Sequence, residues 1–209
     1  LTYSFVSPKI YDKLHYDKDD IRRDSVVISN PLGEDTSIMR TTSIASMMQV
    51  LSLNYNNRNE SVCMYEPATV YIKKGDINTL PEEKVEFCIG AYGAQYDFFA
   101  LKGIVEQTLD AVGINGCRYI AQANNPTFHP GRTADIVKDD VVIGTVGEIH
   151  PEVCEEFGMN TKAYVAVLDF NSIFENCNTT KEYKPLPKFP ATTRDLAVLC
   201  PKSVTMAEI

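Results

Sequence analysis

The sequence predicts an α+β fold, in which a largely antiparallel sheet carries helices on one side. Strand-like and helical runs are mixed along the chain without the regular alternation of βαβ units. Several neighbouring strand-like runs are joined by connections short enough for hairpins. Two longer stretches place apolar residues at helical spacing, and each begins at a residue that favours a helix start. These three observations favour packed layers of sheet and helix over a parallel α/β fold.

The first half of the chain contributes most of the expected strands and one strong helix. Short apolar runs predict strands at Thr2 to Val6 and at Ser25 to Ser29, with a short helix between them from Pro8 to about Tyr16. Ser43 is a good N-cap for the strong helix. The apolar face of that helix consists of Ile44, Met47, Met48, Leu51 and Tyr55, and two further strands are expected at Val62 to Ile72 and Val85 to Tyr92.

The second half begins with another strong helix, which Asp97 caps and Gly113 ends. One face of this helix is apolar from Phe98 to Val112. The remaining expected elements are strands at Cys117 to Ala121, Thr133 to Val137, Val141 to Val146 and Tyr164 to Phe170, and short helices after Pro151 and from Asn171 to Asn176.

A hairpin is the centre of the expected fold. Its two strands, Thr133 to Val137 and Val141 to Val146, are rich in Val, Ile and Thr, which suit a half-buried sheet. The pairs His129-Pro130 and His150-Pro151 bracket it. Because proline keeps the preceding residue out of the α region, each pair marks a corner of the chain.

The size and charge of the chain limit the functions that it can have. The 209 residues are enough for one good core, and 44% of them are apolar. The net charge of −8 argues against a general binder of phosphate backbones. We find no apolar run long enough to span a bilayer and no signal-peptide pattern, and we expect a piece of a longer chain. The six cysteines are widely spaced without a CxxC pair, which favours free thiols in a reducing compartment over a zinc site.

Four polar residues around the hairpin are the candidates for chemistry. His129, Glu148 and His150 together could bind a metal or act in acid–base catalysis. Their spacing matches no metal-protease motif, so we favour structural roles, with the histidines holding turns. Arg132 could grip a carboxylate or phosphate, but an ion pair with Glu148 or a nearby aspartate is the favoured interpretation.

Four stretches in this order and spacing resemble the β subunit of bacterial-type phenylalanyl-tRNA synthetase. Each motif is weak alone, whereas all four in register are specific, and they extend over nearly the whole chain. The stretches are Asn30-Pro31-Leu32 followed by Met39-Arg40-Thr41, Asp97 to Gly103, His129-Pro130-Gly131-Arg132 followed by Gly147 to Val153, and Pro185 to Pro190 followed by Arg194 to Val198.

The resemblance implies a class II aminoacyl-tRNA synthetase-like module with a mostly antiparallel sheet and flanking helices. Residues 1–182 would be this module, residues 183–190 a proline-rich linker, and residues 191–209, beginning with a strand at Thr193 to Leu199, the truncated start of a ferredoxin-like anticodon-binding domain. In this family the α subunit activates phenylalanine and charges tRNA(Phe), and the β module is inactive. We find no GxGxxxR segment, which agrees with inactivity because adenylate formation needs arginines to stabilise the pyrophosphate charge.

The expected function is therefore a structural and subunit-interface module of phenylalanine–tRNA ligase. The resemblance implies an α subunit partner in an (αβ)2 assembly, tRNA(Phe) bound through the parent complex, ATP and magnesium in that complex but no cofactor in this chain, a cytoplasmic location and no membrane. The candidate contacts with α are Met39, Arg40, Thr41, Met47 and Met48.

Two other functions stay open from the sequence. One is a stand-alone, metal-assisted enzyme that uses His129, Glu148 and His150, which metal analysis would test. The other is an amino-acid sensor on a synthetase-like fold, which calorimetry with phenylalanine would test.

Overall fold

One antiparallel sheet organises the part of the chain that this computed structural model describes, which is residues 1–75, 79–180, 183, 185–204 and 209. Every pair of neighbouring strands in it runs antiparallel, as the sequence predicted. Within those residues it has six strands in the order β3-β4-β8-β7-β6-β5. Their bounds are β3 Val62–Ile72, β4 Glu82–Tyr92, β8 Ala163–Asp169, β7 Val141–Ile149, β6 Phe128–Lys138 and β5 Arg118–Ala121.

The central hairpin of β6 and β7 is longer than the sequence predicted. Lys138 pairs with Val141, so the turn consists of Asp139 and Asp140, with φ of 47° and 65°. Positive φ at both central residues matches the twist of a two-residue hairpin, and aspartate tolerates it better than most side chains. A Cβ at Gly144 would lie 2.5 Å from the carbonyl oxygen of Val167, so the close approach of β7 to β8 requires glycine there.

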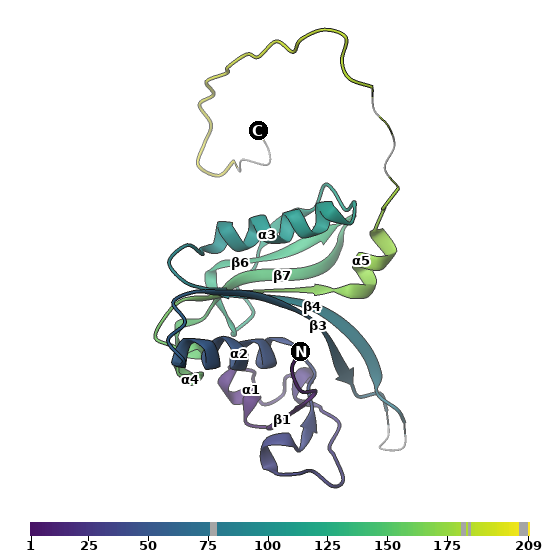
Figure 1. Ribbon diagram of the computed structural model, residues 1–209, viewed down its shortest axis with the longest axis vertical. Coiled ribbons are helices and arrows are strands. Elements are labelled where there is room, and N and C mark those ends of the chain that lie inside the picture. The colour runs from purple at the N-terminus through teal and green to yellow at the C-terminus, as the bar shows by residue number, and fades with distance from the viewer. Residues whose placement is uncertain (76–78, 181–182, 184, 205–208) are drawn as a thin grey trace. The chain divides into compact units, whose positions relative to one another are not determined.

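Helices cover both faces of the sheet, which corrects the expectation of helices on one side (Figure 1). Helix α2, Ile44–Asn56, packs on one face, and α3, Phe98–Ala111, packs on the other. The reason lies in the central strands, which are apolar on both faces. In β4, Cys88 belongs to the core under α2 and Ile89 to the core under α3. We call these the α2 core and the α3 core.

Three shorter helices complete these cores. Helix α1, Ile10–Lys13, and helix α4, Pro151–Glu156, join the α2 core. Helix α5, Phe170–Asn176, contributes Ile173 to the α3 core. All six cysteines are free thiols.

The N-terminal segment forms a small separate ribbon. Strand β1, Phe5–Val6, pairs with β2, Ile38–Met39, and two 3-10 turns, Ile21–Arg23 and Glu34–Thr36, lie between them in the chain. The strand expected at Ser25 to Ser29 is wrong: this run makes a single bridge, from Val27 to Ile38. Its partner β2 is only two residues long, so a longer ladder cannot form.

The two strong helices differ in how they begin. Asp97 accepts a hydrogen bond from the backbone nitrogen of Ala100 at 2.7 Å, as expected of an N-cap. Ser43 occupies the N-cap position of α2 but makes no capping hydrogen bond. Its hydroxyl donates to Glu86 of β4 instead, so a contact with the sheet replaces the expected cap.

The chain divides into two units, Leu1–Thr179 and Thr180–Ile209. The described residues of the second unit contain no helix or strand, so the strand expected at Thr193 to Leu199 is absent. Leu196 and Leu199 are exposed, and a strand without a pairing partner or a buried face has little to stabilise it. Lys184 and residues 205–208 of the expected linker and domain lie outside the described residues, and the domain assignment stays a prediction. Among the described residues, no helix is long and apolar enough to cross a membrane.

Candidate functional site

Arg40 is an internal anchor at the edge of the sheet, with a side chain only 3% exposed. Its Nε donates to the carbonyl oxygen of Thr69 (2.9 Å), and its Nη1 donates to the hydroxyl of Ser46 (3.0 Å). Its Nη2 lies 3.8 Å from Oε1 of Glu66, a carboxylate that also accepts from the backbone nitrogen of Thr2. Arg40 therefore ties together the N-terminus, β3 and α2, and its guanidinium is not available to a ligand.

Four of the five residues expected at a subunit interface are buried in this chain, namely Arg40, Thr41, Met47 and Met48. Met39, in β2, is half-buried. The side chains of Met47 and Met48 lie in the α2 core, so they have no surface to offer a partner. The exposed side of α2 carries Gln49 and Leu53 instead, and Leu53 is 62% exposed. The helical spacing of apolar residues located the helix correctly. The apolar face that produces this spacing packs on the sheet, so it is not the face that a partner could contact.

Arg132 and Glu148 form an ion pair in a cavity of about 500 Å3 on the α3 face. Nη1 of Arg132 lies 2.8 and 2.9 Å from the two carboxylate oxygens of Glu148. The Glu148 side chain is 3% exposed, whereas that of Arg132 is 46% exposed. Burial, together with the Glu148 carboxylate, raises the pKa of Tyr164 on the same wall. The cavity wall thus includes an uncharged phenol, an arginine whose charge Glu148 already balances, and the charged side chains of Asp97 and Lys162.

A second cavity of about 450 Å3 lies on the other face of the sheet, beside α2. Its arginine, Arg22, is also paired within the chain: Nε and Nη2 donate to the two carboxylate oxygens of Asp20, at 2.9 and 2.6 Å. The guanidinium lies over the ring of Tyr16, 3.7 Å from its centroid. Burial raises the pKa of Tyr16 to about 12.

Glu86 lines the same cavity and carries an unusual carboxyl group. Burial raises its pKa, while hydrogen bonds from Ser43 work against that shift. The backbone nitrogen of Ser43 donates to Oε2 of Glu86 at 2.8 Å. Glu86 therefore serves as an acceptor that fixes the start of α2 against β4.

The three residues proposed for a metal-assisted enzyme have different partners in the structure. Nδ1 of His129 accepts from the backbone nitrogen of Gly131 at 3.1 Å, which holds the irregular part of β6 between Phe128 and Thr133. Nδ1 of His150 accepts from the backbone nitrogen of Glu152 at 3.3 Å and caps α4. Glu148 pairs with Arg132 on the α3 face. The three are engaged separately, and no common site is built from these contacts.

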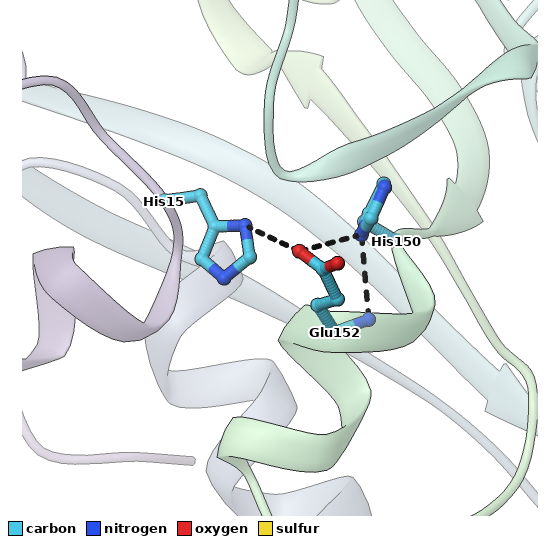
Figure 2. A group of neighbouring side chains, drawn as sticks. All are labelled: His15, His150 and Glu152. Carbon is cyan, nitrogen blue, oxygen red and sulfur yellow. Dashed lines mark hydrogen bonds and ion pairs between the residues drawn. The ribbon is translucent and has the colours of Figure 1, made fainter.

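The structure instead brings His150 together with His15, which sequence reasoning missed (Figure 2). His15 follows α1 and lies far from His150 in the sequence, and no motif or spacing links the two. Glu152 completes the group, with Oε2 lying 4.0 Å from Nδ1 of His15 and 3.9 Å from Nδ1 of His150.

Comparison with known proteins decides which family this architecture represents. Residues 1–170 match the family described as "Phenylalanyl tRNA synthetase beta chain CLM domain". The chain belongs to this family. The matched residues contain the six-stranded antiparallel sheet and three of the four motifs that carried the resemblance, whereas the fourth motif, from Pro185 to Val198, lies beyond them.

Curated relatives of this synthetase domain support the assignment along the whole chain. The chain is 44% identical over 209 residues to the phenylalanine--tRNA ligase beta subunits of Clostridium acetobutylicum and Clostridium tetani, which covers 100% of this chain and 26% of each relative. It is 33% identical over 216 residues to the same subunit of Symbiobacterium thermophilum, covering 98% of this chain and 24% of that one. The chain thus spans about a quarter of the length of these relatives.

A solved structure agrees on the fold. The pyrrolysyl-tRNA synthetase of Desulfitobacterium hafniense superposes with a TM-score of 0.67 at 12% sequence identity, and the match covers 83% of this chain and 61% of that one. At this identity the likeness concerns the fold alone. It places the synthetase β-chain domain in an α+β architecture that a class II synthetase also uses, as the sequence predicted.

Proposed function

We propose that this chain is a non-catalytic structural and subunit-interface module of a cytoplasmic phenylalanine–tRNA ligase. In this role it supports the ATP-dependent charging of tRNA(Phe) with phenylalanine by an α subunit. The observation that carries the proposal is the alignment of the whole chain with β subunits of that ligase at 44% identity.

The state of the arginines supports a non-catalytic role. Adenylate formation needs arginines that are free to stabilise the pyrophosphate charge. The arginine in each of the two cavities on the sheet is already paired with a carboxylate of the same chain, Arg132 with Glu148 and Arg22 with Asp20. Breaking either pair to bind a phosphate would leave a carboxylate unpaired beside it. The proposal therefore assigns ATP and magnesium to the α subunit.

Two exposed surfaces of this chain suit a partner protein. The first is the outer side of α2, where Leu53 is 62% exposed. The second is β3, an outermost strand of the sheet, where Tyr65 is exposed and lies against Phe87 of β4, with 5.4 Å between ring centroids. Arg40 already bonds to the backbone of Thr69 and Tyr71 near one end of β3. Backbone groups that an outermost strand leaves unpaired are normally satisfied by another chain or a covering loop. We propose that α covers these surfaces in the (αβ)2 assembly.

The net charge of −8 does not favour direct contact between this chain and the tRNA backbone. The proposal therefore has tRNA(Phe) bound elsewhere in the parent complex. This module then acts by holding α in its active assembly.

Co-expression of the parent β subunit with an α subunit tests the proposal. We expect the two to purify together and to charge tRNA(Phe), with no charging by either alone. The matched control is the double variant Arg132→Met with Glu148→Met, which removes both partners of the ion pair in the cavity on the α3 face. Charging by the assembled complex that carries this double variant should persist. Charging by the β subunit alone, or loss of the chemical step in an assembled double variant, would contradict a non-catalytic role. Failure to associate with α would contradict the interface role.

A further inference from the structure

We propose that His15, His150 and Glu152 form a binding site for a divalent transition-metal ion of the zinc class. The site lies between the end of α1 and the start of α4, outside both cavities described above. Within the described part of the chain, these three residues bring their potential ligand atoms close enough to share one metal ion, all within 4.8 Å of one another.

The three side chains converge on one point (Figure 2). Glu152 extends from the first turn of α4 and places Oε2 between the two rings, 4.0 Å from Nδ1 of His15 and 3.9 Å from Nδ1 of His150. The ring centroids are 5.9 Å apart. Donor atoms around a zinc ion lie about 2.0–2.2 Å from the metal, so each side chain must move inward by a few tenths of an ångström. Nδ1 of His150 must also exchange its long hydrogen bond from the backbone nitrogen of Glu152, at 3.3 Å, for the ion.

Thr127, which is fully buried, fixes the backbone of both histidine segments. Its hydroxyl donates to the carbonyl oxygen of Leu14, the residue before His15, at 2.7 Å. Its carbonyl oxygen accepts from the backbone nitrogen of His150 at 2.9 Å. A single buried threonine thus holds the backbones of the two histidine segments beside each other before any ion binds. This preorganisation reduces the entropy that a metal must overcome to order its ligands.

A further contact joins the same two helices. Nζ of Lys13 in α1 donates to the carbonyl oxygen of Glu156 in α4 at 2.8 Å. His15 itself has a φ of 59°, a left-handed conformation that a glycine would adopt more readily. The chain therefore presents an imidazole at a position where the backbone alone would favour glycine.

The ligand types select the ion. Two imidazole nitrogens and one carboxylate oxygen suit zinc and its neighbours, whereas magnesium and calcium prefer oxygen alone. Glu155 and Glu156 line the same hollow and add negative charge around the ion. Three protein ligands leave a fourth position for water. Because the ligands come from two segments, a bound ion would clamp α1 to α4.

The test is zinc binding to the 209-residue chain at neutral pH, measured by calorimetry and by the shift in melting temperature. We expect one zinc ion per chain and a higher melting temperature with zinc. His15→Gly is the sharpest variant, because it removes the imidazole and suits the left-handed backbone. It should melt at the same or a higher temperature without zinc and should lose the zinc-dependent rise. Its zinc affinity should fall by more than the roughly tenfold that loss of an outer-shell partner costs.

Two further variants separate this site from other ligands. Glu152→Gln should also weaken binding, and His129→Asn, at the remaining histidine, should leave it unchanged. Cysteines are the main competitors for zinc, and the cobalt spectrum of the wild type should show no thiolate band. The inference is overturned if the wild type binds no zinc up to millimolar concentration. Binding that survives His15→Gly and Glu152→Gln, or a thiolate spectrum, would also overturn it.

Discussion

Arg132 holds both carboxylate oxygens of Glu148, yet only the carboxylate is buried. The side chain of Glu148 is 3% exposed and that of Arg132 is 46% exposed. The two halves of this ion pair are therefore not equivalent, because a released arginine can turn to water whereas a released Glu148 stays in the protein.

We expect Arg132→Met to lower the free energy of unfolding by about 2 kcal/mol, since it leaves a buried charge unpaired. Glu148→Gln should cost about 1 kcal/mol or less, because the amide oxygen still accepts a hydrogen bond and Arg132 reaches solvent. Urea unfolding of both variants measures the difference. A larger loss for Glu148→Gln would show that the arginine is the less tolerant partner.

Alkaline pH should destabilise the fold through Tyr16. Burial raises the pKa of Tyr16 from the ordinary 10.0 to about 12, against a smaller lowering by Arg22. A folded-state pKa above the unfolded value gives a contribution that is complete below pH 10 and is lost as the pH rises through 12. The free energy of unfolding should fall by up to about 2.7 kcal/mol over this window, at about 1.4 kcal/mol for each pKa unit. Denaturation at a series of pH values should show a shallower fall for Tyr16→Phe. Tyr3→Phe, at an exposed tyrosine, is the control and should keep the wild-type slope.

Gly113 and Gly116 have nearly equal φ, so alanine substitutions at the two positions distinguish the cost of backbone strain from the cost of a steric clash. Gly113 has a φ of 78° and Gly116 has a φ of 73°. A Cβ at Gly113 would lie 1.9 Å from the carbonyl oxygen of Asn178, whereas one at Gly116 would meet nothing within 4 Å. Gly116→Ala should cost about 1 kcal/mol, from the left-handed backbone alone. Gly113→Ala should cost at least about 2 kcal/mol more, because the chain near Asn178 must move. Equal melting temperatures for the two variants would contradict this collision.

Local patterns predicted the elements that tertiary contacts also favour. The strand Val62–Ile72 has the predicted bounds, and it pairs along its whole length with β4, which is equally long. The run at Ser25 to Ser29 is as apolar, but β2, the strand to which it bridges, is two residues long. Strand propensity alone does not show whether a partner of sufficient length exists.

The sites were harder to predict than the strands, for a related reason. Ser43 suited an N-cap, but nothing near it in the sequence indicated that Glu86 would attract its hydroxyl. His150 stood out because of its proline, whereas His15 showed no pattern at all. Their meeting depends on Thr127, which joins two segments far apart in the chain. Contacts of this kind come from the sheet topology, which a single sequence does not specify.

The last prediction separates the two sides of α2. Met48 is fully buried in the α2 core, and Leu53 is 62% exposed on the opposite side. Met48→Ala should lower the free energy of unfolding by about 2–5 kcal/mol, since it opens a cavity in a packed core. Leu53→Glu should change it by less than about 0.5 kcal/mol, because the side chain already meets solvent.

If α packs on this helix, Leu53→Glu should instead weaken co-purification with α, by burying a charge without a partner. Gln49→Glu, one turn earlier on the same exposed side, adds the same charge in place of a polar residue and should have a smaller effect. Unchanged assembly in Leu53→Glu would move the α contact away from α2 and toward the exposed face of β3.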